Sequence, residues 1–560
     1  MAALKSTRKH PWWHDAVIYQ VYPRSFASSS GPVGDLAAIT SRLDHLVTVG
    51  ADALWLSPCY VSPQRDGGYD VADYRAIDPQ FGDLADMDEL IAEAHRLGLR
   101  VLVDLVPNHT SDQHAWFRAA LAAGPGGAER ERYWFREGHG EQPPNDWLSV
   151  FGAGAWTRVC DRPDAPGSAW AEDESWYLHL FDSSQPDLNW THPEVLAEFD
   201  DILRFWLRRG VDGFRVDVAH GLAKDPELPS WEHRAEMAGH GDQPQAPMWD
   251  RDEVHEIYRR WHRVLAEFGE DRILVAEAWV DPPERLARYV RADEMHQAFN
   301  FDFLSCPWHA EDLRRVITET CAANEAVGAP TTWVLSNHDV VRHASRLGLA
   351  VTGKGPNGIR PGEPQPDPVL GARRARAATA LMLGLPGSAY LYQGEELGLP
   401  EHLDLPDEVR QDPAFFRTGG AEAGRDGCRV PLPWEGDAPA FGFSPTGESW
   451  LPQPAEWADL AVDRQLADPS STLSLYRDLL RRRRELHLGR GTWEWLDTPA
   501  GVLAGVNRAD PAGSDRAEVL VICTVEAPWQ LPDGWRVLMA TDQVGADGGI
   551  DEAITVWAVR

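Results

Sequence analysis

Short runs of apolar and β-branched residues recur along the chain, and longer stretches with helical periodicity separate them. Eight such runs predict β-strands: Val17–Tyr22, Ala53–Leu56, Arg100–Val106, Gly213–Val216, Ile273–Ala276, Gln297–Phe301, Trp333–Leu335 and Ser388–Tyr392. Apolar residues recur at the spacing of an amphipathic helix in Asp88–Leu97, Pro193–Arg209, Val254–Phe268 and Arg373–Leu383. Strands that alternate with helices form parallel sheets. The pattern therefore predicts an α/β fold of the (β/α)8 TIM-barrel type.

The third and fourth predicted strands lie too far apart for one connecting helix. The intervening chain, from about Asn108 to Trp190, is rich in Trp, Gly and Pro, which predicts an inserted subdomain. After about Leu486, short strands follow closely at Val502–Val506, Glu518–Val525, Trp535–Ala540 and Ile554–Val559. We therefore expect a barrel of residues 1–107 and 185–485, an inserted subdomain of residues 108–184, and a C-terminal antiparallel β domain of residues 486–560.

The charge of the chain limits the partners that we expect. With 53 Lys and Arg against 87 Asp and Glu in 560 residues, the formal net charge is −34. Such a charge repels nucleic-acid phosphates and anionic lipid headgroups. We therefore expect no nucleic-acid partner and no membrane partner. The oligomeric state stays open, a homo-oligomer included.

Three further features favour a cytoplasmic protein. The segment Met1–Asp15 has no apolar stretch of signal-peptide length, and the longest apolar run, Ala377–Tyr392, is interrupted by Gly and Pro. The six cysteines are scattered without the spacing of a disulfide framework or a zinc site. Free thiols are typical of the cytoplasm.

Candidate catalytic side chains follow the predicted strands, because functional groups of a TIM barrel lie at the carboxyl ends of its strands. The polar residues at these positions are Asp104, His109, Arg215, Asp217, His220, Glu277, His338 and Asp339. Asp217, Glu277 and Asp339 belong to three different strands, so we expect their carboxylates to meet at one end of the barrel. With no cluster of further ligands beside them, they favour paired acid–base chemistry over a metal centre.

Four ordered motifs resemble the signatures of the α-amylase family of glycoside hydrolases. They are Asp104-Leu-Val-Pro-Asn-His109, Gly213-Phe-Arg-Val-Asp-Val-Ala-His220, Ala276-Glu-Ala-Trp279 and Ser336-Asn-His-Asp339. Gln185-Pro-Asp-Leu-Asn189 resembles a further motif of the oligo-1,6-glucosidase and α-glucosidase branch, as do segments within Ile18–Phe26 and Gly424–Trp434. The resemblance extends from about Trp13 to Trp434.

The resemblance implies a role for each acid. Asp217 corresponds to the nucleophile, Glu277 to the general acid and base, and Asp339 to the carboxylate that stabilises the distorted sugar of the transition state. A retaining glycosidase needs two carboxyl groups about 5 to 5.5 Å apart, one ionised and one protonated. Arg215 precedes Asp217 by two residues on the same predicted strand, so its side chain is expected on the same side, where its charge favours the ionised nucleophile.

The same resemblance implies a set of residues that bind the terminal glucose. They are Asp66, Tyr69, His109, Arg215, His338, Arg342 and Arg429. Asp66 and Tyr69 match positions that hold hydroxyl groups and stack on the sugar, and the two histidines match hydrogen-bonding positions. Arg429 is chosen over its neighbour Arg425 on the motif alone.

A calcium loop of many relatives is changed in this chain. Where those relatives carry an Asp-x-Asn-x-Asp-Gly site after the first strand, the chain reads Ser28-Ser-Ser-Gly-Pro-Val-Gly-Asp35. Calcium takes six to eight oxygen ligands, usually including several carboxylates. With one acid in the loop, we predict no metal and no other cofactor.

The motifs together favour an exo-acting, retaining α-glucosidase that removes terminal glucose from maltose and short malto- and isomalto-oligosaccharides. The alternatives are an oligo-1,6-glucosidase and a transglucosylase of the sucrose isomerase or trehalose-forming type. A non-enzymatic alternative, a transporter-associated barrel protein, is disfavoured because all three acids are present. Val218 resembles the residue of isomaltases at this position, whereas the segment Glu401–Trp434 resembles maltose-cleaving relatives, so we expect both linkages to be cleaved, with maltose favoured.

Overall fold

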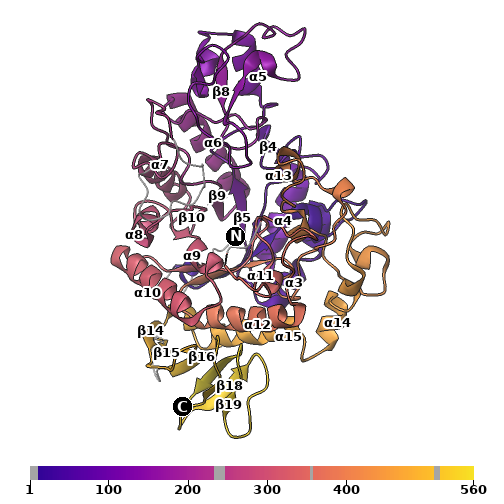
Figure 1. Ribbon diagram of the computed structural model, residues 1–560, viewed down its shortest axis with the longest axis vertical. Coiled ribbons are helices and arrows are strands. Elements are labelled where there is room, and N and C mark those ends of the chain that lie inside the picture. The colour runs from indigo at the N-terminus through magenta and orange to yellow at the C-terminus, as the bar shows by residue number, and fades with distance from the viewer. Residues whose placement is uncertain (1–10, 232–245, 354–356, 510–517) are drawn as a thin grey trace.

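A closed parallel barrel forms the centre of the molecule (Figure 1). The structure is a computed structural model that describes residues 11–231, 246–353, 357–509 and 518–560. Its barrel strands are β1 (Val17–Val21), β2 (Ala53–Leu56), β5 (Arg100–Leu105), β9 (Gly213–Val216), β10 (Ile273–Ala276), β11 (Gln297–Ala298), β12 (Thr332–Val334) and β13 (Ser388–Tyr392). They lie in the order β11-β10-β9-β5-β2-β1-β13-β12, and a parallel bridge between Phe299 and Thr332 closes the ring. The predicted TIM barrel is confirmed.

One barrel strand is much shorter than its apolar run predicts. Gln297–Phe301 was expected to be extended throughout, but β11 ends at Ala298. Asn300 caps a short helix, α9 (Phe301–Ser305), because its side chain accepts a hydrogen bond from the amide of Phe303. Phe301, the last residue of the run, is therefore buried at the start of a helix rather than in the strand.

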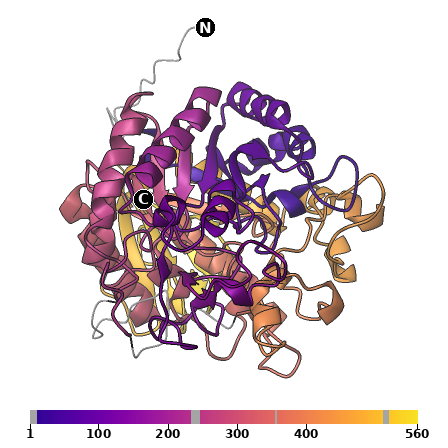
Figure 2. The ribbon, with the colours of Figure 1, turned by 90° about the horizontal axis from the view of Figure 1, so that it is seen from above.

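Helices surround the barrel, as the view from the insert end shows (Figure 2). The principal helices are α4 (Leu84–Arg96), α6 (Pro193–Arg209), α7 (Val254–Ala266), α10 (Ala310–Val327), α12 (Pro368–Gly384) and α15 (Thr472–Glu485). The shorter ones are α1 (Pro23–Phe26), α2 (Leu36–Ser41), α3 (Leu43–Val49), α8 (Pro283–Ala287), α11 (His343–Arg346), α13 (Pro413–Arg417) and α14 (Val462–Ala467).

Local sequence signals set the ends of these helices. In α6, the side chain of His192 accepts from the amide of Glu194, Pro193 occupies the first turn, and Gly210 ends the helix with a φ of 104°. Glycine adopts this left-handed backbone conformation at the lowest cost in free energy. The helix buries a stripe that includes Phe199 and Trp206, so the predicted limits of Pro193–Arg209 are confirmed.

The segment between β5 and β9 folds over one end of the barrel, at the top of Figure 1. It contains α5 (Ala115–Ala123) and a three-stranded antiparallel sheet of β6 (Phe135–Arg136), β8 (Trp176–Leu178) and β7 (Trp156–Arg158). A second hairpin, β3 (Tyr60–Val61) with β4 (Asp73–Ile77), follows β2. Trp134, Trp147 and Trp156 are buried in one apolar cluster with Val218 and Trp249. The insert thus reaches the end of β9.

A C-terminal antiparallel sheet lies at the opposite end (Figure 1). Its order is β14 (Thr492–Trp495), β15 (Leu503–Arg508), β16 (Glu518–Cys523), β20 (Thr555–Val559) and β18 (Arg536–Ala540), beside a small pair, β17 (Trp529–Gln530) and β19 (Gly549–Ile550). Trp557 donates its indole N–H to the carbonyl of Ala380 in α12 at 3.0 Å, which holds the sheet against the barrel. The division at residues 108, 185 and 486 stays a prediction, and residues 1–10, 232–245, 354–356 and 510–517 of it lie outside the described residues.

Two further predictions can be compared with the structure. All six cysteines are free. Among the described helices, none combines the length and the apolar character that a membrane crossing requires.

Candidate active site

The register of β9 and β10 brings Asp217 and Glu277 to the same level. The two strands pair Val216 with Ala276, so the next residue of each strand is one of the two acids. The amide of Asp217 donates to the carbonyl of Leu105 at 2.9 Å, and the amide of Glu277 donates to the carbonyl of Val216 at 3.0 Å. Hydrogen bonds of the barrel therefore fix the backbone of both Asp217 and Glu277.

Arg215 lies between three carboxylates. Its guanidinium is 2.6 Å from Asp217, 3.0 Å from Glu277 and 2.9 Å from Asp104. The register of β5 and β9 places Asp104 directly opposite Arg215. All four side chains are buried. Arg215 thus lies beside Asp217, and Asp104 fixes the guanidinium from the other side.

The three carboxylates outnumber the one guanidinium, and the pKa values of two of them, Asp104 and Asp217, are raised. Burial raises the pKa of Asp104 to about 7, while Arg215 lowers it. Burial also raises the pKa of Asp217, Arg215 opposes this, and the charges of Glu277 and Asp104 add to it. Because one guanidinium cannot balance three buried carboxylates, the cluster as a whole favours binding a proton, which the coupled carboxyl groups share. A retaining glycosidase requires one protonated carboxyl group.

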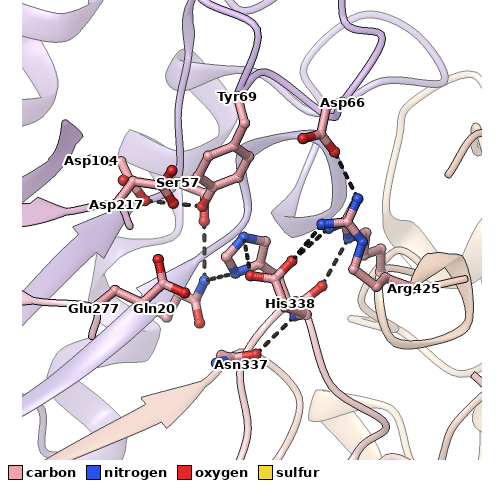
Figure 3. A network of polar contacts seen from close by, with 12 residues as sticks. Gln20, Ser57, Asp66, Tyr69, Asp104, Asp217, Glu277, Asn337, His338 and Arg425 are labelled. Carbon is pink, nitrogen blue, oxygen red and sulfur yellow. Dashed lines mark hydrogen bonds and ion pairs between the residues drawn. The ribbon is translucent and has the colours of Figure 1, made fainter. Parts of the chain in front are cut away.

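A second cluster surrounds Asp339, whose carboxylate is contacted by Arg425 and His338, both labelled in Figure 3, and by Arg429. Arg425 and Arg429 donate to its carboxylate at 3.0 and 2.9 Å. His338 Nε2 lies 3.1 Å from its other oxygen. Burial opposes the ionisation of Asp339, but these three neighbours outweigh burial and hold its pKa well below the usual range. Asp339 is therefore a fixed negative charge at neutral pH.

Arg425 connects Asp339 to Asp66 on the other side of the site (Figure 3). It donates to Asp66 Oδ1 at 2.7 Å and also pairs with the buried Asp412. The guanidinium of Arg425 lies over the ring of Phe151 from the insert, 5.2 Å from the ring centroid. The loop after β13 thus reaches both the barrel and the turn that carries Asp66.

The turn that carries Asp66 depends on its two glycines and on Asp70. Gly67 has a φ of 58°, and a Cβ at this position would lie 2.8 Å from the hydroxyl of Tyr22. The Asp70 carboxylate accepts hydrogen bonds from the amides of Arg65 and Asp66 at 3.0 and 3.1 Å. This explains why the sequence reads Asp-Gly-Gly at this turn.

His338 is held in one orientation by its neighbours. Its ring stacks on Tyr69, with centroids 5.2 Å apart, and Tyr22 lies on it at 5.9 Å. The amide nitrogen of Gln20 lies 2.7 Å from Nδ1, so Gln20 donates to Nδ1 and the ring proton is on Nε2, the nitrogen beside Asp339. Burial keeps the pKa of His338 far below its usual value, and the ring is neutral.

His109 joins the site from the end of β5. Burial lowers its pKa to about 4, so the ring is neutral at pH 7. Gln185 places its amide nitrogen 3.1 Å from His109 Nε2 and 3.0 Å from the carboxylate of Asp66. Gln185 belongs to the motif at the end of the insert, so that motif contributes a side chain to the site.

The structure brings most of the predicted side chains together around one space. These are Asp66, Tyr69, His109, Arg215, Asp217, Glu277, His338, Asp339 and Arg429. Arg342 is different: its guanidinium donates to the carbonyls of Gln393 and Cys428 at 2.9 and 2.8 Å, and it stabilises the loop around Cys428 rather than pointing at the acids. The sequence did not lead us to include Arg425, Gln185 or Gln20 in the site, although all three lie in segments that resemble motifs of the family.

A buried lysine joins the barrel to the insert beside this site. Lys224 Nζ lies 2.9 Å from the carboxylate of Asp187, and it donates to Asn108 Oδ1 at 2.9 Å and to the carbonyl of Gly221 at 2.8 Å. Both charged side chains are fully buried. Burial lowers the pKa of Lys224, and Asp187 raises it. One ammonium group therefore holds the end of β5, the loop after β9 and the end of the insert.

The one acid of the Ser28–Asp35 loop makes its contacts within the chain. The Asp35 carboxylate caps α2 by accepting from the amide of Ala38 at 2.8 Å, and it also accepts from the amide and hydroxyl of Ser29 at 2.7 and 2.9 Å. In the described segments, no three His, Cys, Asp or Glu side chains form a metal-binding group.

Treatment with a calcium chelator should leave the melting temperature unchanged. The acid of the Ser28–Asp35 loop is already used for capping, and a bound ion would otherwise raise the stability of the folded state. The measurement is a thermal melt with and without chelator, at constant ionic strength set with sodium chloride. A melting temperature that falls with chelator and recovers with added calcium would contradict the prediction.

A TIM barrel with carboxylates at the ends of its strands is an architecture found in glycoside hydrolases, among other classes of enzyme. The family model for the α-amylase catalytic domain matches residues 20–490, and the chain belongs to this family. It is 38% identical over 516 residues to a probable α-glucosidase of Rhizobium meliloti (strain 1021), with 88% of this chain and 86% of the relative covered. It is 33% identical over 512 residues to an oligo-1,6-glucosidase of Parageobacillus thermoglucosidasius, with coverage of 85% and 84%.

A solved structure agrees with these relatives. The crystal structure of the α-glucosyl transfer enzyme XgtA superposes with a TM-score of 0.82 at 34% identity, covering 99% of this chain and all of that one. The resemblance inferred from the motifs is thus confirmed at the level of the family and the fold.

Proposed function

We propose that the protein is an exo-acting, retaining α-glucosidase that removes terminal, non-reducing α-linked glucose from maltose and short malto- and isomalto-oligosaccharides. The observation that carries this proposal is the network in which Arg215 joins Asp217 to Glu277, and Arg425 joins Asp339 to Asp66. At the reacting centre, Asp217 and Glu277 share the guanidinium of Arg215. Beside it, the ion pair between Arg425 and Asp66 crosses the site.

In the first step of the proposed reaction, Asp217 attacks the anomeric carbon and the glycosidic C–O bond breaks. Glu277 gives its proton to the departing oxygen, and glucose remains joined to Asp217. The ionised state belongs on Asp217, because the guanidinium of Arg215 approaches it most closely, at 2.6 Å. In the second step, Glu277 removes a proton from water, water attacks the anomeric carbon from the opposite face, and Asp217 is released.

The surroundings of the other residues of the site indicate the role of each. Asp339, held ionised by its cationic neighbours, stabilises the positive charge that develops on the sugar ring. His338 presents a neutral Nε2–H group, and Asp66 and His109 face the same space for the sugar hydroxyls. Arg342 is not part of this set, because its donors already bind two backbone carbonyls.

The exo mode follows from the ion pair between Arg425 and Asp66. It joins the loop after β13 to the turn after β2, and Phe151 of the insert lies against the same guanidinium. A chain that continued past the terminal glucose in this direction would have to separate buried, paired charges. The site therefore accepts a chain end rather than the interior of a polysaccharide.

A transglucosylase is the second candidate, and the similarity to an α-glucosyl transfer enzyme favours it. Hydrolysis and transfer share the glycosyl-enzyme and differ only in whether water or a sugar hydroxyl attacks it. The catalytic acids do not distinguish the two. Incubation with concentrated maltose, followed by separation of the products, does: a hydrolase yields glucose alone, and a transglucosylase yields glucose with trisaccharides.

The chemistry of the thiols supports a cytoplasmic location as part of the proposal. Four cysteines, Cys59, Cys306, Cys428 and Cys523, are buried, and none of the six is in a disulfide. Proteins with this many free thiols are typical of reducing compartments.

Val218 is the residue through which we propose that linkage preference acts. It follows the nucleophile directly, and its backbone has a φ of 46°, which is strained for a β-branched residue. Its side chain is buried in the apolar cluster of the insert. Strain beside a reacting group indicates a position that is fixed for function.

Val218→Thr should raise the ratio of kcat/KM for maltose over isomaltose by about 10-fold, without abolishing either activity. The two side chains are nearly isosteric, so the change replaces a methyl group by a hydroxyl at the wall of the site. Val216→Thr is the matched control, because Val216 belongs to the core outside the acid cluster. Equal ratios in wild type, Val216→Thr and Val218→Thr would show that Val218 acts only in packing.

The proposed function as a whole is tested by incubating the protein with maltose, isomaltose, sucrose and trehalose and following the products by proton NMR. We expect glucose from maltose and isomaltose, with maltose the better substrate, and the α-anomer formed first. Absence of glucose release from every α-glucoside would contradict the proposal.

A further inference from the structure

The two oxygens of Glu277 have different surroundings. Oε2 receives the backbone N–H of Val218 at 2.9 Å and lies 3.0 Å from the guanidinium of Arg215. Neither group can accept a hydrogen bond, because a guanidinium and an amide N–H are donors only. The in-plane lone pairs of Oε2 are therefore both in use, and the proton of the neutral acid belongs on Oε1.

Trp279 lies beside Oε1. Its indole Nε1 lies 3.3 Å from Oε1 and donates to it. The indole is stacked on Phe301, with centroids 4.0 Å apart and an angle of 10° between the rings. Asn300 caps the helix that begins at Phe301, so the partner ring is fixed to the barrel. The indole is half-buried and packs against the apolar cluster inside the barrel.

We propose that Trp279 is a positioning residue for the general acid: its N–H keeps Oε1, the oxygen that carries the proton, turned toward the leaving group. This rests on the proposed function, in which Glu277 protonates the glycosidic oxygen. As the proton leaves, Oε1 becomes negatively charged, and a donor already aimed at it stabilises that charge. In Glu277, Oε2 is thus held by Val218 and Arg215, and Oε1 delivers the proton to the leaving group.

The charges around Glu277 come from the neighbouring strands. Arg215 and Asp217 face it from β9, and Asp104 faces the same guanidinium from β5. None of these groups is removed when Trp279 changes. A loss of the indole N–H therefore affects proton delivery while the ion-pair cluster remains complete.

The test uses leaving groups that differ in their need for a proton. 4-Nitrophenoxide departs without protonation, whereas the glucose of maltose does not. Trp279→Phe keeps a ring that can stack on Phe301 and removes the N–H. We expect kcat/KM for maltose to fall about 10-fold, as for the loss of one hydrogen bond to a charged group, and kcat/KM for 4-nitrophenyl α-glucoside to change less than about 2-fold.

Phe301→Leu is the matched control, because it removes the stacking partner and leaves the N–H in place. It should change kcat/KM for the two substrates by the same factor. Replacement of Trp279 by 3-benzothienylalanine, which has the shape of Trp without the N–H, should reproduce the selective loss if Trp279→Phe does not fold. Equal loss on both substrates in the Trp279 variants, as in Phe301→Leu, would overturn the proposal and leave Trp279 a packing residue.

Glu277→Gln separates this failure from that of the proposed function. If Glu277→Gln loses maltose hydrolysis selectively while the Trp279 variants do not, only the role of Trp279 is wrong. If Glu277→Gln keeps normal activity on maltose, Glu277 is not the acid and both proposals fail.

Discussion

Asp217→Asn should lower the turnover of maltose by several orders of magnitude, as expected when a catalytic nucleophile is removed. A neutral amide cannot attack the anomeric carbon, so no glycosyl-enzyme forms. The fold should survive, because the amide oxygen can still accept a hydrogen bond from Arg215, which lies 2.6 Å from Asp217 in the wild type. Turnover is measured by glucose release, with circular dichroism and thermal melts as the control for folding. Near-normal turnover would show that another group is the nucleophile.

Glu277→Gln should give a different pattern, because this residue acts as an acid and not as the attacking group. Maltose hydrolysis should fall by a similar factor. An activated aryl glucoside should still release a burst of phenol, after which the glycosyl-enzyme accumulates, since its hydrolysis needs the same residue as a base. Rapid-quench kinetics measure the burst. A variant that lacked the burst and lost both substrates equally would contradict the division of roles between the two acids.

Lys224→Met should destabilise the protein by about 3 to 5 kcal/mol, the usual cost of removing one partner of a buried ion pair. It leaves the buried carboxylate of Asp187 without its cation and the Asn108 side chain and Gly221 carbonyl without a donor. The measurement is urea unfolding followed by tryptophan fluorescence, with attention to the transition of the barrel and insert.

The double variant Lys224→Met with Asp187→Asn provides the control for the Lys224 prediction. Removing the second charge should recover a large part of the lost stability, because the cost arises mainly from the unpaired carboxylate. If the two single losses simply add in the double variant, the ammonium and the carboxylate are not coupled, and the account of Lys224 is wrong.

The barrel could be predicted from the sequence because each strand is a short apolar run bounded by polar residues. The runs at β2, β9, β10 and β13 match the observed strands residue for residue. The run at Gln297–Phe301 does not, because the cap at Asn300 competes with strand formation and apolar periodicity cannot distinguish a short buried helix from a strand. The strands of the insert, two or three residues each, are too short to give a periodic signal.

The candidate site could be predicted where the barrel geometry fixes it. Asp217 and Glu277 follow neighbouring strands, so their meeting depends only on register. Sequence alone could not decide which of Arg425 and Arg429 belongs to the site, because both lie on an irregular loop whose path no periodicity describes. In the structure, the guanidinium groups of both contact the carboxylate of Asp339. The strained φ of Val218 likewise leaves no signal in the sequence, since valine is a residue that the left-handed region disfavours.

The central claim is that Asp217 attacks the sugar in a retaining mechanism, and trapping the glycosyl-enzyme tests it most directly. The protein is incubated with 5-fluoro-α-D-glucosyl fluoride, whose ring fluorine slows the second step while its fluoride leaves without protonation, and is then digested and analysed by mass spectrometry. We expect one added fluoroglucosyl group, located on Asp217, and no adduct in Asp217→Asn. An adduct on another carboxylate, or turnover with β-glucose as the first product and no adduct at all, would contradict the account.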